Sequence, residues 1–130
     1  MPGPFSRRPC RVLIVPHCYE CGVTLQLVLS QSGCHAEVVR GGDAAVRRAL
    51  ETLPDAVLVD LDLPGEDGWQ VGRRLRAGLG SAVRLIGTAP YTWEGDPAGW
   101  AEARFDGWLR KPVIPDDLLG LITSAEEGSR

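Results

Sequence analysis

Residues 56–68 read A-V-L-V-D-L-D-L-P-G-E-D-G, and this stretch says most about the fold class. Its first four residues are apolar, which is typical of a strand buried on both faces of a parallel sheet. Asp60 and Asp62 interrupt the apolar run, and Pro64-Gly65 ends it. We therefore expect both carboxylates where a strand passes into a loop. Open α/β sheets bind their ligands at these carboxyl ends of strands, so the two acids are candidate site residues.

The rest of the chain alternates short apolar runs with amphipathic stretches, and Asp43 and Asp67 are expected to cap two helices. This alternation predicts an α/β fold, with a five-stranded parallel sheet doubly wound by five helices in a single domain. Residues 1–9 are expected to form a disordered lead-in, residues 10–124 the folded domain, and residues 125–130 a flexible tail. The predicted strands cover residues 11–15, 35–40, 56–61, 83–87 and 107–110, and the predicted helices cover residues 20–32, 43–52, 67 to about 80, 97–104 and 115–124.

The composition excludes several classes of function. A chain of 130 residues with 44% hydrophobic content suits one compact domain. Its net charge of −3 offers no general attraction to nucleic acid, so no nucleic-acid partner is expected. No apolar stretch approaches the roughly 18 residues of a membrane span, and no membrane partner is expected. The first ten residues lack the apolar core of a signal peptide, so we expect a cytoplasmic protein.

Four cysteines, at positions 10, 18, 21 and 34, allow more than one interpretation. Cys18 and Cys21 form a C-x-x-C motif, which is typical of zinc sites and of redox pairs. The predicted helix between Cys21 and Cys34 separates Cys18 from Cys34 by about 15–18 Å, too far for ligands of one zinc ion. Free thiols in a reducing compartment are the expectation, and a redox or metal sensor stays open as an alternative.

Polar side chains follow several of the predicted strands. In the predicted topology one edge of the sheet receives His17 and Cys18, then Asp60, then Thr88 and finally Lys111. A carboxylate can act as a nucleophile on phosphorus and form an acyl phosphate. Hydroxyl and ammonium donors stabilise the charge that builds on the phosphoryl oxygens. The combination therefore indicates handling of a phosphoryl group.

On these residues the chain resembles the receiver domain of bacterial two-component response regulators, over residues 11–122. The family motif D-x-x-x-P-G-x-D-G matches residues 60–68, with Asp60 at the phosphoacceptor position. Thr88 with the following alanine matches the hydroxyl position after the fourth strand. Lys111 with the following proline matches the lysine after the fifth strand, and Trp108 matches the switch aromatic.

The resemblance implies a signalling protein, not an enzyme: a stand-alone receiver in a phosphorelay. A histidine kinase or phosphotransfer protein would phosphorylate Asp60, and the new charge would draw Thr88 inward and turn Trp108. The face formed by the fourth helix, the fifth strand and the fifth helix would change shape. A downstream protein or a second copy of the chain would bind that face.

One departure from the family concerns the metal. Receivers carry two acids after the first strand that help to bind Mg²⁺, and this chain has Pro16-His17 there. Of the expected ligands, Asp60 and the carbonyl of Asp62 remain, which makes a weak site for an ion that prefers oxygen ligands in octahedral geometry. An alternative is therefore a pseudo-receiver, which keeps the fold as a protein-interaction module and works without phosphorylation.

Overall fold

The computed structural model describes residues 10–89, 105–111 and 113–128. Five parallel strands form the central sheet in the order β2-β1-β3-β6-β7. The elements of the sheet layers are β1 (Cys10–Val15), α1 (Tyr19–Gln31), β2 (Cys34–Val38), α2 (Gly42–Thr52), β3 (Ala56–Asp60), α3 (Gly68–Leu79), the 3-10 helix η2 (Gly80–Ala82), β6 (Arg84–Ala89), β7 (Gly107–Arg110) and α5 (Pro115–Gly128). A separate two-stranded antiparallel sheet pairs β4 (Asp62–Leu63) with β5 (Glu66–Asp67).

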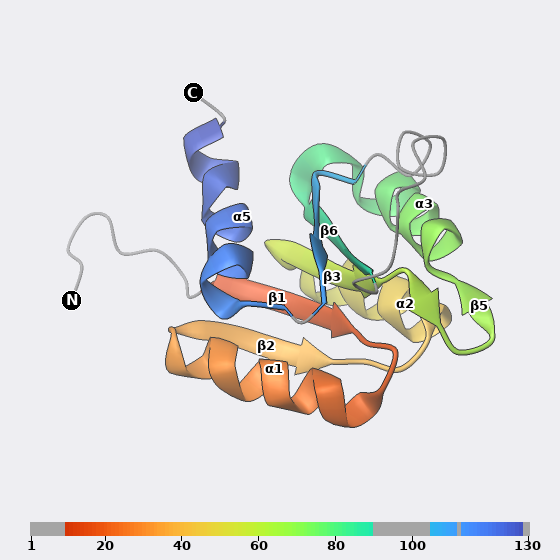
Figure 1. The fold of residues 1–130 in the computed structure, drawn as a ribbon. Coiled ribbons are helices and arrows are strands. Elements are labelled where there is room, and N and C mark those ends of the chain that lie inside the picture. The colour runs from red at the N-terminus through yellow and green to blue at the C-terminus, as the bar shows by residue number, and fades with distance from the viewer. Residues whose placement is uncertain (1–9, 90–104, 112, 129–130) are drawn as a thin grey trace.

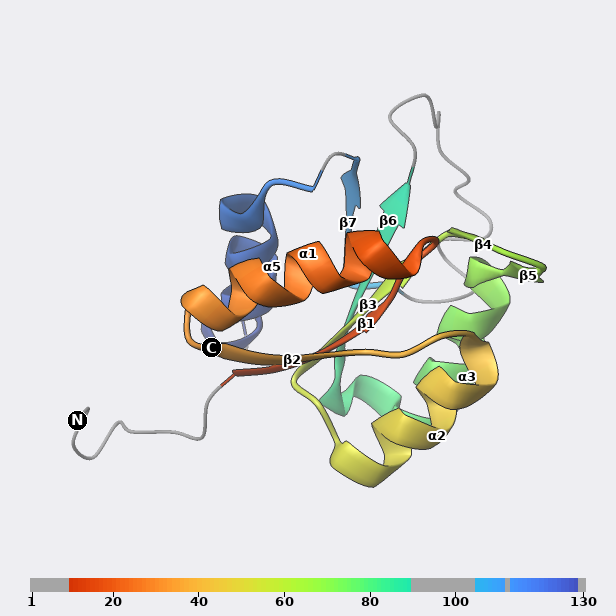
Figure 2. The ribbon, with the colours of Figure 1, turned by 90° about the horizontal axis from the view of Figure 1, so that it is seen from below.

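The sheet is covered by helices on both faces (Figure 1). Seen from below, α1 and α5 lie on one face, and α2 and α3 lie on the other (Figure 2). The chain reverses the direction in which it adds strands between β1 and β3, which are neighbours in the sheet. Such a switch point is where open α/β sheets place their ligand sites, at the carboxyl ends of the strands.

Each strand alternates its side chains between two hydrophobic layers. Val12 and Ile14 of β1 pack on the side of α1 and α5, with Leu29 and Leu118. The intervening side chains of β1 and β3 pack on the opposite side, with Val71 and Leu75 of α3. Strands that are apolar at every position are expected when both faces are covered, and this explains the uninterrupted A-V-L-V run of β3.

The predicted five-stranded parallel sheet, covered by helices on both faces, is confirmed. Four of the five predicted helices are present, and the predicted helix over residues 97–104 lies outside the described residues. The helix α5 continues to Gly128, past the predicted end at residue 124. The β4–β5 hairpin was not predicted, because strands of two residues are too short to have a periodicity.

The predicted N-cap at Asp43 is wrong. Helix α2 begins one residue earlier, and Gly41 occupies the N-cap without a side-chain hydrogen bond. The first amide of the helix, that of Gly42, donates instead to Glu66 Oε2 at 2.9 Å. Asp43 lies in the first turn and pairs with Arg74 of α3, at 2.6 Å. A side chain from the β4–β5 hairpin therefore satisfies the helix start that a local residue was expected to cap.

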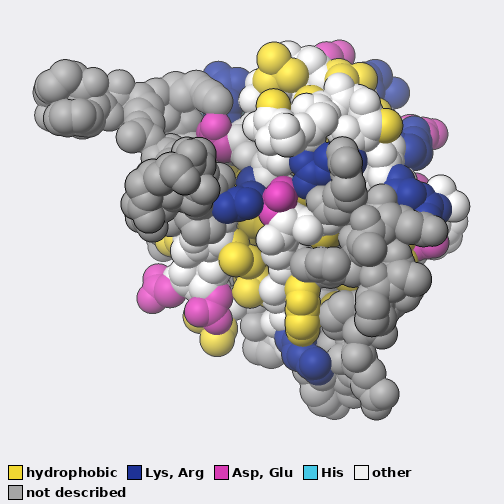
Figure 3. Space-filling model, turned by 90° about the horizontal axis from the view of Figure 1, so that it is seen from above, with side chains coloured by type: hydrophobic (Ala, Val, Ile, Leu, Met, Phe, Trp, Pro, Cys, Tyr) yellow, Lys and Arg dark blue, Asp and Glu magenta, His cyan; other side chains and the backbone are white. Residues whose placement is uncertain are grey.

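The surface seen from above carries charges of both signs (Figure 3). Lys and Arg side chains alternate with Asp and Glu over the described part of this face. This mixture is in keeping with the net charge of −3. No helix within the described ranges is both long enough and apolar enough to cross a membrane.

Candidate functional site

The motif over residues 60–68 folds as a strand end, a tight hairpin and a helix start. Strand β3 ends at Asp60, and the hairpin of β4 and β5 turns at Pro64-Gly65. Gly65 has a φ of +72°, a conformation that a β-turn reaches most easily with glycine. Asp67 then caps α3, because its Oδ1 accepts the Trp69 amide at 2.9 Å, as the sequence predicted.

Gly68 allows the start of α3 to approach the end of β3. A Cβ atom at this position would lie 2.5 Å from the Asp60 carbonyl oxygen and 2.6 Å from Leu61 Cα. Backbone atoms cannot yield at such distances without moving the strand end. The Asp67-Gly68 pair therefore has two separate physical roles: the aspartate caps the helix, and the glycine admits it beside the candidate acceptor.

The carboxylate of Asp60 is buried, and both of its oxygens have partners. The residue is only 3% exposed. Its Oδ1 accepts the amide of Asp62 at 3.0 Å. Its Oδ2 accepts the amide of His17 at 3.2 Å and forms an ion pair with Lys111 Nζ. A buried carboxylate needs such partners, because moving the charged group out of water without them costs roughly several kcal/mol of free energy.

Sheet register brings Thr88 and Lys111 to the same edge. Thr88 of β6 is the register partner of Asp60, and its carbonyl accepts the Leu61 amide at 2.8 Å. The Lys111 amide donates to the Ala89 carbonyl at 2.8 Å, which holds the end of β7 against β6. Asp60, Thr88 and Lys111 line one cavity of about 370 Å³. Three distant parts of the chain thus deliver an acid, a hydroxyl-bearing residue and an amine to one cavity.

Most of the chain matches a known protein family. The family model for the response regulator receiver domain matches residues 12–123, which is most of the chain. The chain belongs to the response regulator receiver domain family. It is 32% identical to the DNA-binding response regulator MtrA of Mycobacterium tuberculosis, in an alignment that covers 86% of this chain and 48% of MtrA. It is also 28% identical to the sensor protein GacS of Pseudomonas syringae, over 92% of this chain and 14% of that protein.

Solved structures of receivers have the same fold. The CheY-like receiver domain of Methylobacillus flagellatus matches with a TM-score of 0.79 at 24% identity, covering 89% of this chain and 98% of that one. The receiver domain of a modulated diguanylate cyclase from Desulfovibrio desulfuricans matches with a TM-score of 0.73 at 30% identity, covering 94% and 96%. This receiver spans about half the length of the MtrA regulators that it matches. Its family is one of signalling domains in two-component systems.

Receiver domains generally bind Mg²⁺ beside the phosphoacceptor, and the residues of this receiver do not fit that ion. Pro16 offers no side-chain ligand. The carbonyl of Asp62, which the sequence left as a backbone ligand, is hydrogen-bonded to the His17 ring. The His17 Nδ1 atom lies 2.6 Å from the Asp62 carbonyl oxygen. Because a carbonyl can only accept, Nδ1 carries the proton of this hydrogen bond. Within the described residues no group of three or more acids, histidines or cysteines is placed to hold a metal.

His17 is the site residue whose role the sequence did not reveal. Its amide reaches one carboxylate oxygen of Asp60, and its ring reaches the backbone of Asp62. Its ring also lies 3.8 Å from Asp62 Oδ2. The sequence offered one signal for this role. His17 directly follows Pro16, at a position where the family resemblance implies an acid. At that position this chain places one amide donor and one ring donor.

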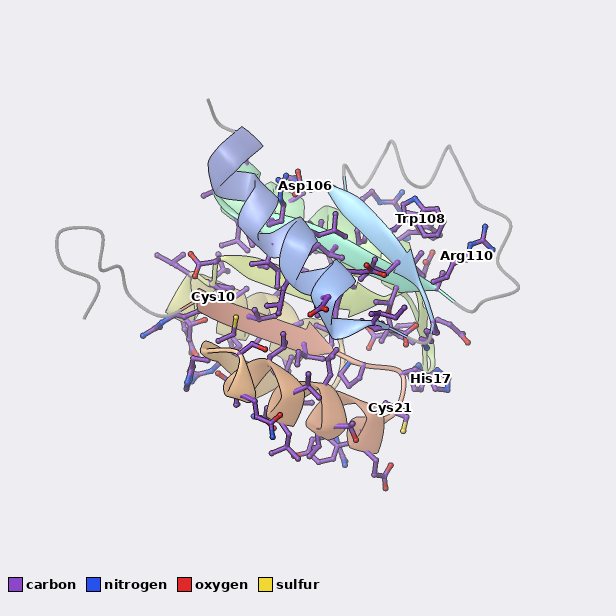
Figure 4. All side chains as sticks on the ribbon, turned by 60° about the vertical axis from the view of Figure 1, so that its left-hand side comes forward. Cys10, His17, Cys21, Asp106, Trp108 and Arg110 are labelled. Atoms are coloured by element: carbon purple, nitrogen blue, oxygen red, sulfur yellow. The ribbon has the colours of Figure 1, made fainter. Side chains whose placement is uncertain are left out.

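Trp108 and Arg110 lie on β7, on the side of the molecule where His17 and Cys21 also lie, and Cys10 lies on the opposite side (Figure 4). The Trp108 side chain is half-buried. The Arg110 guanidinium carbon lies 5.4 Å from the centre of the Trp108 ring, within range of a cation–π contact. The proline after Lys111, which completes the family match at this position, lies outside the described residues.

Proposed function

We propose that this receiver domain accepts a phosphoryl group on Asp60 from a histidine kinase or a phosphotransfer protein. The observation that carries the proposal is the buried Asp60 carboxylate, which shares a cavity with Thr88 and Lys111 at the switch point of the sheet. Interactions between receivers and such donors are general in the family. We further propose that residues 10–124 form the receiver unit.

The hydrogen bonds of Asp60 favour one oxygen as the nucleophile. Among the described residues Oδ1 accepts one amide, from Asp62, whereas Oδ2 accepts the His17 amide and pairs with Lys111. An oxygen with fewer donors keeps a lone pair for attack on phosphorus. In the proposed step Oδ1 forms the new P–O bond, and the bond from phosphorus to the donor's nitrogen breaks.

Lys111 is the proposed stabiliser of the phosphoryl oxygens. The Lys111 side chain is 36% exposed, whereas that of Asp60 is almost fully buried. The ammonium group can therefore turn from Oδ2 toward an incoming phosphate. Thr88, at the register position of Asp60, is the proposed hydroxyl donor. Loss of one such donor slows group transfer by about 10²-fold in well-studied enzymes, and we expect a similar effect from Lys111→Gln.

The proposed output is a change on the face formed by β7 and α5 together with the predicted helix over residues 97–104. Phosphorylation adds a charge of about −1.5 to −2 beside Thr88. Movement of Thr88 toward this charge frees space toward Trp108, whose half-buried ring lies on β7. A downstream protein or a second copy of the chain is the proposed reader of that face.

The test is covalent labelling followed by intact mass measurement. The purified protein is incubated with acetyl phosphate, once with EDTA and once with millimolar Mg²⁺, and separately with a phosphorylated phosphotransfer protein. We expect one added phosphoryl group, its loss in Asp60→Asn, and its retention in the neighbouring control Asp62→Asn. No uptake under any condition, or uptake that persists in Asp60→Asn, would contradict the proposal.

The pseudo-receiver is a second candidate, and one observation favours it. The contact of His17 with the Asp62 carbonyl takes the place where the family's metal ion binds. Under this alternative the fold binds its partner without phosphorylation. The labelling experiment separates the two candidates, because a pseudo-receiver takes up no phosphoryl group and keeps its partner affinity in Asp60→Asn.

A further inference from the structure

Two cysteines at the start of α1 have no part in phosphoryl transfer. Cys18 is the N-cap of α1, and Cys21 follows in the first turn. Their sulfur atoms lie 3.1 Å apart. A disulfide has an S–S length of about 2.05 Å, so a bond between them requires an approach of only about 1 Å. The reduced protein therefore already holds the two thiols near bonding geometry.

The pair is also accessible to an oxidant. Cys21 is exposed and Cys18 is half-buried. Figure 4 shows Cys21 beside His17 at the edge of the molecule, projecting from the start of α1. The chain has a second candidate pair, because Cys10 of β1 and Cys34 of β2 are register partners. Cys34, however, is only 6% exposed, so an oxidant cannot reach it without opening the sheet.

Hydrogen bonds assign different roles to the two sulfurs. Cys18 Sγ accepts the Cys21 amide at 3.4 Å and the Cys21 thiol at 3.1 Å, and it lies 3.4 Å from Glu20 Oε1, to which it can donate. The hydrogen bond to Cys18 is the largest cause that raises the pKa of the Cys21 thiol. Cys21 therefore holds its proton more tightly than an ordinary thiol, which leaves Cys18 as the sulfur of the pair that attacks first.

We propose that Cys18 and Cys21 form a reversible dithiol–disulfide pair that is oxidised by thiol–disulfide exchange with a low-molecular-weight disulfide. In the first step Cys18 loses its proton to water, and its thiolate attacks one sulfur of the oxidant, forms a mixed disulfide and releases one thiolate, which takes up a proton. In the second step Cys21 loses its proton to water, and its thiolate attacks Cys18 Sγ and displaces the second thiolate. The protein loses two electrons and two protons, and the oxidant becomes two thiols. The proposal does not depend on phosphorylation of Asp60.

The test uses the full chain and two matched double variants. Wild type, Cys10→Ser/Cys34→Ser and Cys18→Ser/Cys21→Ser are equilibrated with mixtures of glutathione and glutathione disulfide. Acid quenching and alkylation with N-ethylmaleimide then report the free thiols by intact mass. We expect wild type and Cys10→Ser/Cys34→Ser to lose two thiols each to an internal disulfide that dithiothreitol reverses. We expect Cys18→Ser/Cys21→Ser to keep both of its remaining thiols.

A single variant checks the order of the two steps. Cys21→Ser lacks the second thiol and should accumulate one glutathione on Cys18, whereas wild type should not. Far-ultraviolet circular dichroism of each variant checks that the fold is kept. The proposal is overturned if wild type stays fully reduced where a reference dithiol is oxidised. It is equally overturned if the oxidised form joins Cys10 to Cys34, links two molecules, or stops at the mixed disulfide.

Discussion

Two ion pairs lie at opposite ends of the sheet, and they differ in which member is buried. At the carboxyl ends of the strands the acid Asp60 is buried, and its partner Lys111 is 36% exposed. At the amino ends of β6 and β7 the cation Arg76 of α3 is buried, with an 8% exposed side chain, and the side chain of its partner Asp106 is 29% exposed. The pair at the carboxyl ends lines a cavity that a ligand can enter.

Both buried charges are satisfied by backbone groups as well as by the opposite charge. The Arg76 guanidinium donates to the Gly80 and Val83 carbonyls at 2.7 and 3.0 Å and to Asp106 at 2.8 Å. Asp106 in turn accepts the Leu85 amide at 2.7 Å, so this pair joins α3, η2, β6 and the start of β7. Burial of a charge alone therefore does not indicate function. Position at the carboxyl ends of strands, beside a cavity, separates the candidate acceptor from the structural pair.

The largest effect is expected where the structural pair is broken. Arg76→Met takes the guanidinium donor from the part-buried Gly80 carbonyl and the buried Val83 carbonyl, so we expect a loss of about 3 kcal/mol in the free energy of unfolding. Arg74→Met in the same helix is the matched control, because Arg74 and its partner Asp43 are 46% and 87% exposed. That control should cost less than about 0.5 kcal/mol. Urea denaturation measures both, and equal losses would refute the structural role of Arg76.

A smaller loss is expected from a methyl group at the acceptor end. Gly68→Ala places its Cβ against the backbone of Asp60 and Leu61, and we expect a cost of about 2 kcal/mol. Alanine ordinarily stabilises a helix relative to glycine, so the sign of this change is diagnostic. The control Gly120→Ala in α5 has nothing within 4 Å and should stabilise by about 0.5 kcal/mol. Thermal and urea unfolding distinguish the two signs.

A gain of metal binding is expected when the acid is restored. His17→Asp removes the ring from the Asp62 carbonyl and adds an oxygen ligand beside Asp60. At a Mg²⁺ concentration ten times the dissociation constant, the variant should gain about 1.4 kcal/mol of stability. His35→Asp, which changes the other histidine in β2, should gain nothing, and neither should wild type. Equal stabilisation of all three proteins by Mg²⁺ would show that the ion acts elsewhere.

The smallest change in stability is expected at the acceptor itself. Asp60→Asn keeps an acceptor oxygen for one amide, and Lys111 can turn to solvent, so we expect a change below about 1 kcal/mol. The same variant should take up no phosphoryl group. If it unfolds as readily as Arg76→Met, the pair at the carboxyl ends is structural as well, and the contrast between the two ends of the sheet is lost.

The sequence allowed the sheet and most helix positions to be predicted, because both follow from local patterns. Apolar runs bounded by glycine and proline located the strands, and the D-x-x-x-P-G-x-D-G motif located the candidate acceptor. The cap of α2 was mispredicted because its hydrogen-bond partner, Glu66, lies 24 positions away along the chain. The roles of Arg76 and His17 were missed for the same reason, since their partners come from other elements.

Local sequence patterns placed particular residue types at the ends of particular strands, because hydrophobic periodicity and turn residues act over a few positions. What those side chains contact depends instead on the tertiary structure. Packing buried Asp60 and Arg76 but left Lys111 partly open, and it put the His17 ring on the Asp62 carbonyl. The burial of these residues and the contacts they make depend on sheet register and on packing between distant segments, which no local pattern records.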